Sequence, residues 1–355
     1  MDALPVELVD LVIDKLRDDK LSLKICSLVC KTWLRQSSAH LFRSLRVNIW
    51  VSGCWPPRQK NLKITLDTES MAEVATIATQ LPQLRSLSVR GTMMDPVTSR
   101  APPPCSGRRL ECLSVSDVHL DVIPYFLGLF ASVGTLKIST CKAIHNEPAP
   151  LQHVYPVRCF YVRGYIQKGD FGHVIELLDP AVLESANLRI SWPILPLSPA
   201  DLNQLFRTAR PALRDLTINI GDSGWHHGVA DLSALQACTR LESLTIAFEW
   251  RLYFESDWWR EMLAFLAVLP PHIRVVRIIT RPVYGHPVSD IRNVLRAVEW
   301  RTVGSALEHC FGLECLRITV DEKDARPISA PEYRDLQEAI LAALPSRLRC
   351  KTVFK

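Results

Sequence analysis

The chain has 355 residues, of which 48% are hydrophobic and 22% are charged, and its formal net charge is +5 at pH 7. This composition excludes disorder as the default state. The mild charge also disfavours a nucleic-acid binder, which normally gathers basic residues into a patch or stripe. A chain of this length has room for two or three ordinary domains, or for one small domain and one extended array.

Three features bear on the cellular compartment. The chain starts with MDALP, without the basic and apolar stretches of a signal peptide. Its longest uncharged run, Val122 to Leu136, is too short to cross a membrane and contains Pro124, Gly128 and Gly134. The 11 cysteines form no C-x-x-C pair, which predicts reduced and mostly buried thiols. We therefore expect a cytoplasmic or nuclear protein without membrane contacts.

The first 45 residues predict a short helical segment with a surplus of apolar side chains. Pro5 suits the first turn of a helix, and the charge of Glu7 favours the same end. Such a small unit buries little area by itself, so the surplus either marks a partner site or packs on the rest of the chain. The apolar residues at helical spacing are Leu8, Val9, Leu11, Val12, Ile13 and Leu16, and then Leu21, Leu23, Ile25, Leu28 and Val29, before Trp33, Leu41 and Phe42.

This segment resembles an F-box. The Leu4-Pro5-x-Glu7-Leu8 start, the apolar residues four apart and the Val29-Cys30-Lys31-x-Trp33 stretch follow that family's pattern in order. The resemblance implies a three-helix domain that binds the Skp-family linker of a cullin–RING ubiquitin ligase. It implies linker contacts by Leu4, Pro5, Leu8, Val12, Ile13 and Leu16, and it leaves Leu21, Val29, Cys30 and Trp33 either at that interface or in the core behind it.

An apolar-x-x-apolar-x-apolar phrase then recurs along the chain. Each copy alternates apolar and polar residues, which predicts a strand with one buried face. The copies are Leu84–Val89, Leu110–Val115, Val133–Ile138, Val157–Val162, Leu188–Ile190 (preceded by Ser185), Leu213–Ile218, Leu241–Ile246, Ile273–Ile278, Leu313–Ile318 and a weaker Leu348–Val353. Helices are predicted between them, at Met71–Leu81, Tyr125–Ala131, Phe171–Leu178, Ala200–Ala209, Leu232–Cys238, Trp258–Leu269, Ile291–His309 and Glu332–Leu344.

A repeated helix–strand unit is typical of a solenoid, because no unit can bury its apolar face alone. The phrase resembles the leucine-rich repeat. That family has Asn or Cys shortly after the last apolar residue, and here only Cys141 fits. The other copies have Thr92, Val118, Tyr165, Pro193, Gly221, Glu249, Arg281 and Asp321 there. The buried Asn ladder is therefore in doubt.

The predicted fold class is thus an α/β repeat, with a three-helix F-box over residues 1–45 and an irregular leucine-rich-repeat-like solenoid over residues 46–355. The alternative is an ordinary α/β domain of alternating strands and helices, and the recurrence of the phrase favours the solenoid. Two further strands, Leu45–Val51 and Leu62–Leu66, are expected to cap the array, and Asp95–Arg109 has the composition of an exposed loop.

Target-binding candidates come from two places. The fifth residue of each phrase faces away from the core, and four of the nine are basic: Ser88, Ser114, Lys137, Tyr161, Arg189, Thr217, Thr245, Arg277 and Arg317. This pattern predicts an acidic or phosphorylated target, and the alternative is a solvated face without selectivity. Aromatic residues in the loops after the strands, above all Trp225 and Trp250, are candidate interface anchors.

Signals for chemistry are weak. The tetrad around Ser223 matches that of trypsin-like proteases, with His226 and His227 beside it, but the β-barrel pattern of those enzymes is missing. No cysteine pair has zinc-site spacing with a second pair to match, so neither metal nor cofactor is expected. The sequence predicts a non-enzymatic substrate receptor of an SCF-type ligase. The alternatives are a repeat scaffold unconnected with ubiquitination, and a hydrolase that uses Ser223.

Overall fold

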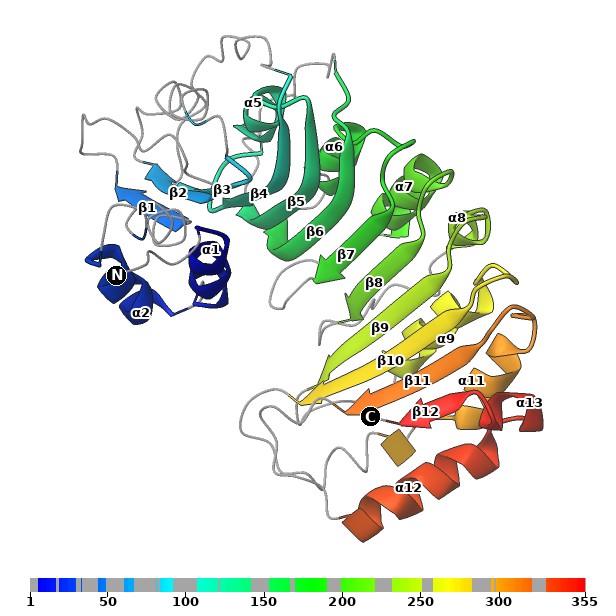
Figure 1. Ribbon diagram of the computed structural model, residues 1–355. Helices are drawn as coiled ribbons and strands as arrows, with labels where there is room; N and C mark the ends of the chain where they lie inside the picture. Colours follow the sequence, from blue (N-terminus) through cyan, green and yellow to red (C-terminus); the bar gives the residue numbers. More distant parts are fainter. Residues whose placement is uncertain are drawn as a thin grey trace. The chain divides into compact units, whose positions relative to one another are not determined.

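A computed structural model describes residues 6–16, 19–29, 33, 44–48, 61–66, 81, 84–91, 107–120, 122–141, 153–166, 170–189, 199–220, 232–250, 258–282, 295–296, 298–320 and 330–354. The chain forms two compact units, Met1–Gly134 and Thr135–Lys355. Figure 1 shows the helices and strands of both units. The domain boundary expected at residue 45 stays a prediction.

Two helices lie near the N-terminus, α1 (Val6–Lys15) and α2 (Lys20–Ser27). α2 begins at Asp19, whose carboxylate accepts hydrogen bonds from the backbone N–H of Leu21 and of Ser22 at 3.1 and 3.2 Å. The Ser22 hydroxyl donates a further bond of 2.6 Å to the same carboxylate. These bonds satisfy N–H groups that the first helical turn leaves without partners. The third helix expected in this segment falls largely outside the described residues, of which Trp33 is helical.

The strands of the first unit are parallel and follow one another in chain order. Both strands expected before the first phrase are present, and they pair directly with the phrase strands rather than forming a separate element. Leu87 of one phrase is the register partner of Leu113 of the next, and both are buried. The elements are β1 (Ser44–Asn48), β2 (Asn61–Leu66), β3 (Ser86–Gly91), β4 (Arg109–Ser116) and α5 (Val122–Gly128).

The second unit repeats this plan. β5 (Ser132–Cys141) crosses the boundary between the units, and the later strands lie beside one another in chain order. Every pairing described from β6 onward is parallel. The strands are β6 (Val157–Ile166), β7 (Ser185–Arg189), β8 (Asp215–Ile220), β9 (Ser243–Trp250), β10 (Val275–Pro282), β11 (Cys315–Val320) and β12 (Thr352–Phe354).

The register confirms that the phrase is the structural repeat. The last apolar residues of successive phrases are register partners, which form the row Val162, Leu188, Ile218, Ile246, Ile278, Ile318 and Phe354. One phrase begins earlier than expected. Leu188 lies in this row, so its phrase is Leu183-Glu184-Ser185-Ala186-Asn187-Leu188. Ala186 occupies a position held elsewhere by a larger residue, and this substitution hid the correct start.

Each helix of the second unit buries one stripe. In α7 the fully buried residues are Leu202, Leu205, Phe206 and Ala209, at the spacing of one helical face. In Figure 1 the helices α6 to α11 lie on one side of the strands. A doubly wound α/β domain would have helices on both faces, so this arrangement favours the repeat array. The helices are α6 (Asp170–Glu176), α7 (Pro199–Ala209), α8 (Ser233–Gln236), α9 (Trp258–Ala267), α11 (Trp300–Leu307), α12 (Ala330–Ala343) and α13 (Ser346–Arg349).

Two expected elements differ or stay open. The helix expected at Ile291–His309 is shorter, because α11 begins at Trp300, whose indole N–H donates to the Leu295 carbonyl at 2.8 Å and so closes the preceding turn. The helix expected at Met71–Leu81 and most of the loop at Asp95–Arg109 fall outside the described residues. Across the described ranges, no helix combines the length and apolarity needed to traverse a lipid bilayer.

Candidate functional site

α1 and α2 carry apolar side chains on two sides. On the inner side Val9, Ile13, Leu23 and Cys26 form a small buried core. On the outer side lies a second set, which we call the N-terminal apolar face: Leu8, Leu11, Val12, Leu21, Ile25, Leu28 and Val29. Each of its members is at least 40% exposed, and Leu28 reaches 85%. The surplus inferred from the sequence is therefore located on the surface.

The helical period explains why both sides are apolar. In α1 the buried pair Val9 and Ile13 is four residues apart, and the exposed pair Leu8 and Val12 is offset by one residue. Of the eleven large apolar side chains that are exposed within the described ranges, seven belong to this one face. Exposed apolar side chains scattered singly are normal on proteins, whereas a continuous group marks a contact surface.

The structure separates residues that the sequence left together. Leu8, Val12, Leu21 and Val29 lie on the N-terminal apolar face. Ile13 is fully buried, so it belongs to the core and not to an interface, and this corrects its expected place. Leu16 and Trp33 are partly buried and pack against the same core. The remaining candidates Leu4, Pro5 and Cys30 fall outside the described residues.

A second surface lies on the helix-free side of the strands in the second unit. We call it the open face, and it carries the residues that alternate with the buried ones. The register aligns the fifth residues of successive phrases into one row: Tyr161, Asn187, Thr217, Thr245, Arg277, Arg317 and Val353. A neighbouring row contains Arg163, Arg189, Asn219, Ala247, Ile279 and Thr319.

The basic candidates occupy this face in two groups. Arg189 is not a fifth residue, as the sequence indicated, because it pairs with Arg163 in the neighbouring row. The Lys137 ammonium lies 5.7 Å from the centre of the Tyr161 ring, which places a third cation in this group. At the other end Arg277 and Arg317 are register partners. Four of the predicted residues are therefore brought together in pairs rather than in one even row.

A charge pattern at the strand starts escaped the sequence reading. The second residue of each phrase alternates between Arg and Glu, and successive members are hydrogen-bonded through their backbones: Arg158, Glu184, Arg214, Glu242, Arg274 and Glu314. The Arg274 guanidinium lies 2.8 Å from the Glu314 carboxylate, and in the first unit Arg85 lies 3.2 Å from Glu111. The hydrogen bond to Glu314 raises the pKa of Arg274. This charge ladder was visible in the sequence once the phrases were aligned.

The aromatic candidates remain separate. Trp250 is the last residue of β9, where its backbone pairs with Pro282 of β10. Trp225 lies outside the described residues, as do Ser223, His226 and His227. Nearby in sequence, the Arg260 guanidinium lies 5.8 Å from the centre of the Trp259 ring at the start of α9. The expected role of these aromatic residues as interface anchors stays a prediction.

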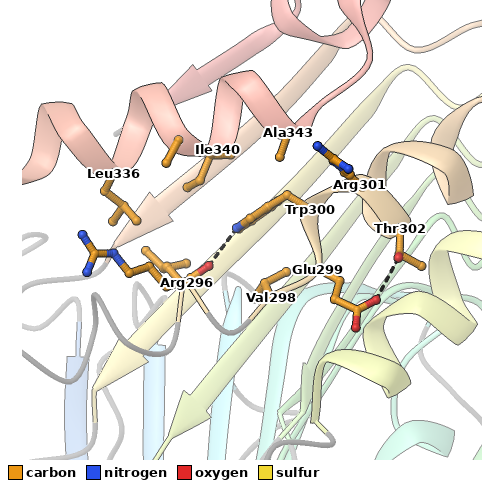
Figure 2. A pocket seen from close by; sticks show the side chains of 11 residues that line it. Arg296, Val298, Glu299, Trp300, Arg301, Thr302, Leu336, Ile340 and Ala343 are labelled. Carbon is orange, nitrogen blue, oxygen red and sulfur yellow. Dashed lines mark hydrogen bonds between the residues drawn. The ribbon is translucent and has the colours of Figure 1, made fainter.

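One groove is present beside the array, between α12 and the start of α11, with a volume of about 420 Å³. Figure 2 shows Leu336, Ile340 and Ala343 on one side, and Val298 and Trp300 on the other. The Thr302 hydroxyl donates to the Glu299 carboxylate at 3.0 Å. The larger apolar side chains are buried by their contacts with one another, so the groove reads as an open seam between two packed helices.

The described thiols show no activated nucleophile. Burial raises the pKa of Cys238 and of Cys310 to about 11 in each case, which disfavours the reactive thiolate. The Cys310 Sγ lies 3.7 Å from His309 Nε2, but that nitrogen is 2.8 Å from the Leu269 carbonyl. Within the described ranges, no group of three or more His, Cys, Asp or Glu residues could hold a metal ion.

The chain was compared with known proteins in three ways. No protein-family model matches it, and no curated protein matches it. Among solved structures it is similar to the leucine-rich repeat-containing protein LegL7 from Legionella pneumophila, with 10% sequence identity and a TM-score of 0.37 over 83% of this chain and 97% of that one. Similarity at this level carries no inference about the present chain, whose repeat architecture is established by its own strand register.

Proposed function

We propose that this chain is a non-catalytic substrate receptor of an SCF-type cullin–RING ubiquitin ligase. The N-terminal apolar face would bind the Skp-family linker, and the repeat array would hold the target protein. The receptor would then act by proximity, because it places the target near a ubiquitin-charged enzyme that other subunits recruit. The observation that carries this proposal is the second, outward apolar stripe on both α1 and α2.

The burial pattern supports the first half of the proposal. If α1 and α2 served only as the end cap of a solenoid, one apolar stripe on each would suffice, and a cap normally presents a polar outer face. Instead Leu8, Val12 and Leu21 are exposed while Val9 and Leu23 fill the core. Burying such a face against a partner removes apolar area from water, which is the main driving force of association.

The open face supports the second half. Parallel strands with helices on one side leave the other side available over the length of the array, and repeat proteins use such extended surfaces for binding. This feature alone also fits a repeat scaffold unconnected with ubiquitination. The two proposals differ only in the partner of the N-terminal apolar face.

The test is co-purification of the tagged full-length chain with the linker and a cullin subunit from cells. We expect both subunits with the wild type, and neither with a variant that combines Leu8→Asp and Val12→Asp. Val154→Asp is the matched control, because Val154 is an exposed valine outside the N-terminal apolar face. Capture that is lost only in the double variant supports the ligase receptor. Capture of neither subunit by the folded wild type would leave the scaffold alternative.

A further inference from the structure

The open face of the second unit places arginine beside arginine twice. Arg163 of β6 is the register partner of Arg189 of β7, and Arg277 of β10 is the register partner of Arg317 of β11. Like charges directly opposite one another on neighbouring strands are destabilising. These pairs therefore cost stability in the isolated chain, and a ligand that neutralises them would recover it.

The charge ladder shows that the same array can avoid such repulsion. At the strand starts each arginine has glutamate beside it, and Arg274 is paired with Glu314 at 2.8 Å. Three residues further along the same two strands, Arg277 has Arg317 as its neighbour instead. The contrast lies within one pair of strands, so a general excess of basic residues does not explain it.

The surroundings of the second pair contain little compensating charge. The Arg277 guanidinium donates to the neutral Ser243 hydroxyl at 3.0 Å. The Arg317 Nε is shielded from solvent, and no hydrogen-bond partner for it is found in the described part of the chain. In the rows of the open face whose side chains are described, the acidic residue is Asp215, on β8 and two strands away from Arg277.

We propose that the open face binds an extended segment of the target that carries two phosphate groups, one at Arg277 and Arg317 and the other at Arg163 and Arg189. A phosphorylated side chain carries nearly two negative charges and several acceptor oxygens. Two adjacent guanidinium groups match it in charge and in hydrogen-bonding capacity, whereas a single carboxylate would neutralise only one of them. The proposal rests on the proposed function only in assigning target binding to the array.

The geometry sets the spacing of the two phosphates. The centres of the two arginine pairs are four strand spacings apart, which is about 19 Å at the usual separation of strands. An extended peptide advances about 3.3 Å per residue, so the phosphorylated residues should be about six positions apart. Between the pairs, β8 and β9 present the small neutral side chains of Thr217, Asn219, Thr245 and Ala247, which leave room for a peptide backbone.

The test measures fluorescence anisotropy of labelled Ser/Gly peptides against the full-length chain without any linker, at physiological ionic strength, where charges about 19 Å apart are screened from one another. The peptides carry two phosphoserines six apart, two phosphoserines two apart, one phosphoserine, none, or glutamate in place of both phosphoserines. We expect the first to bind at least about tenfold more tightly than the singly phosphorylated peptide, through bivalent attachment.

Charge-neutralising variants complete the test. Combining Arg277→Gln with Arg317→Gln should reduce binding of the doubly phosphorylated peptide to the singly phosphorylated level, and should leave the melting temperature unchanged or higher. The matched control combines Arg214→Gln with Arg274→Gln, which removes the same charge from the ladder, and should retain the wild-type affinity. Equal binding of all peptides, equal loss in the control, or full binding of the glutamate peptide would each overturn the proposal. Linker binding is absent from this assay, so its failure would not affect the result.

Discussion

The backbone of Gly312 lies against the carbonyl group of His272, in the turn that precedes the next strand of the array. A Cβ placed on Gly312 would be 2.7 Å from the His272 oxygen and 2.8 Å from its carbonyl carbon. The Gly312 N–H also donates to the Pro271 carbonyl at 2.9 Å, which holds the two turns together. Close approach of two backbones is thus part of how neighbouring repeats stack.

We predict that Gly312→Ala destabilises the second unit by about 1–3 kcal/mol, the usual cost of forced overpacking. The clash is with backbone atoms, which cannot rotate away as a side chain can. Gly172→Ala is the control, because a Cβ there meets the flexible end of the Gln204 side chain, and alanine is favoured within a helix. Denaturant unfolding of both variants would check this. Equal stability of the wild type and Gly312→Ala would contradict the packing described.

A second prediction separates the surface of α1 from its core. Val12→Asp should change the free energy of unfolding by no more than about 0.5 kcal/mol, as for other exposed positions. Ile13→Asp should unfold the N-terminal helices, because it places a charge in a fully buried site. Hydrogen exchange over residues 6–29 measures both effects. Comparable loss of protection in the two variants would show that the N-terminal apolar face is buried in solution.

The buried thiols predict a response to alkaline pH. The pKa of Cys238 and of Cys310 is raised by burial from 9.0 to about 11 in each case. Between these values the unfolded chain loses the thiol protons while the folded chain keeps them, so stability falls as pH rises from about 9 to about 11. Combining Cys238→Ala with Cys310→Ala should flatten this part of the stability profile. An unchanged slope would exclude the two thiols as its cause.

The cap of α2 predicts the opposite dependence at acidic pH. The hydrogen bond from the Ser22 side chain, together with bonds from backbone N–H groups, lowers the pKa of Asp19. The stabilisation is therefore present above the ordinary carboxylate pKa and is lost as pH falls through the lowered value. Asp19→Ala should weaken protection of α2 at neutral pH and remove this acidic dependence. Identical exchange in the wild type and variant at all pH values would contradict the capping role.

The alternating phrase was sufficient to predict where the strands lie, because a period of two with one buried face has few alternatives. It failed at Ala186, where a small residue replaced the expected large one and the start of the phrase was misplaced. The register then moved Arg189 from the fifth-residue row to the neighbouring one. Only the pairing of strands could show that its neighbour is Arg163, and that Arg277 lies beside Arg317.

The N-terminal segment shows the same division. Its apolar surplus could be read from the sequence, since more residues were apolar than one helical face requires. Which of them form the core could not, because Val12 and Ile13 are adjacent and equally apolar, and the direction of the partner helix decides between them. Burial assigns Ile13 to the core and Val12 to the surface.

The central claim is that the N-terminal apolar face binds the Skp-family linker, and calorimetric titration of the purified full-length chain with that linker tests it most directly. The account predicts saturable binding with one linker per chain. Val12→Asp should weaken it by roughly tenfold or more, as expected for a residue within an interface, and Val154→Asp should not. Absence of saturable binding by the folded wild type, or equal weakening by both substitutions, would contradict the account.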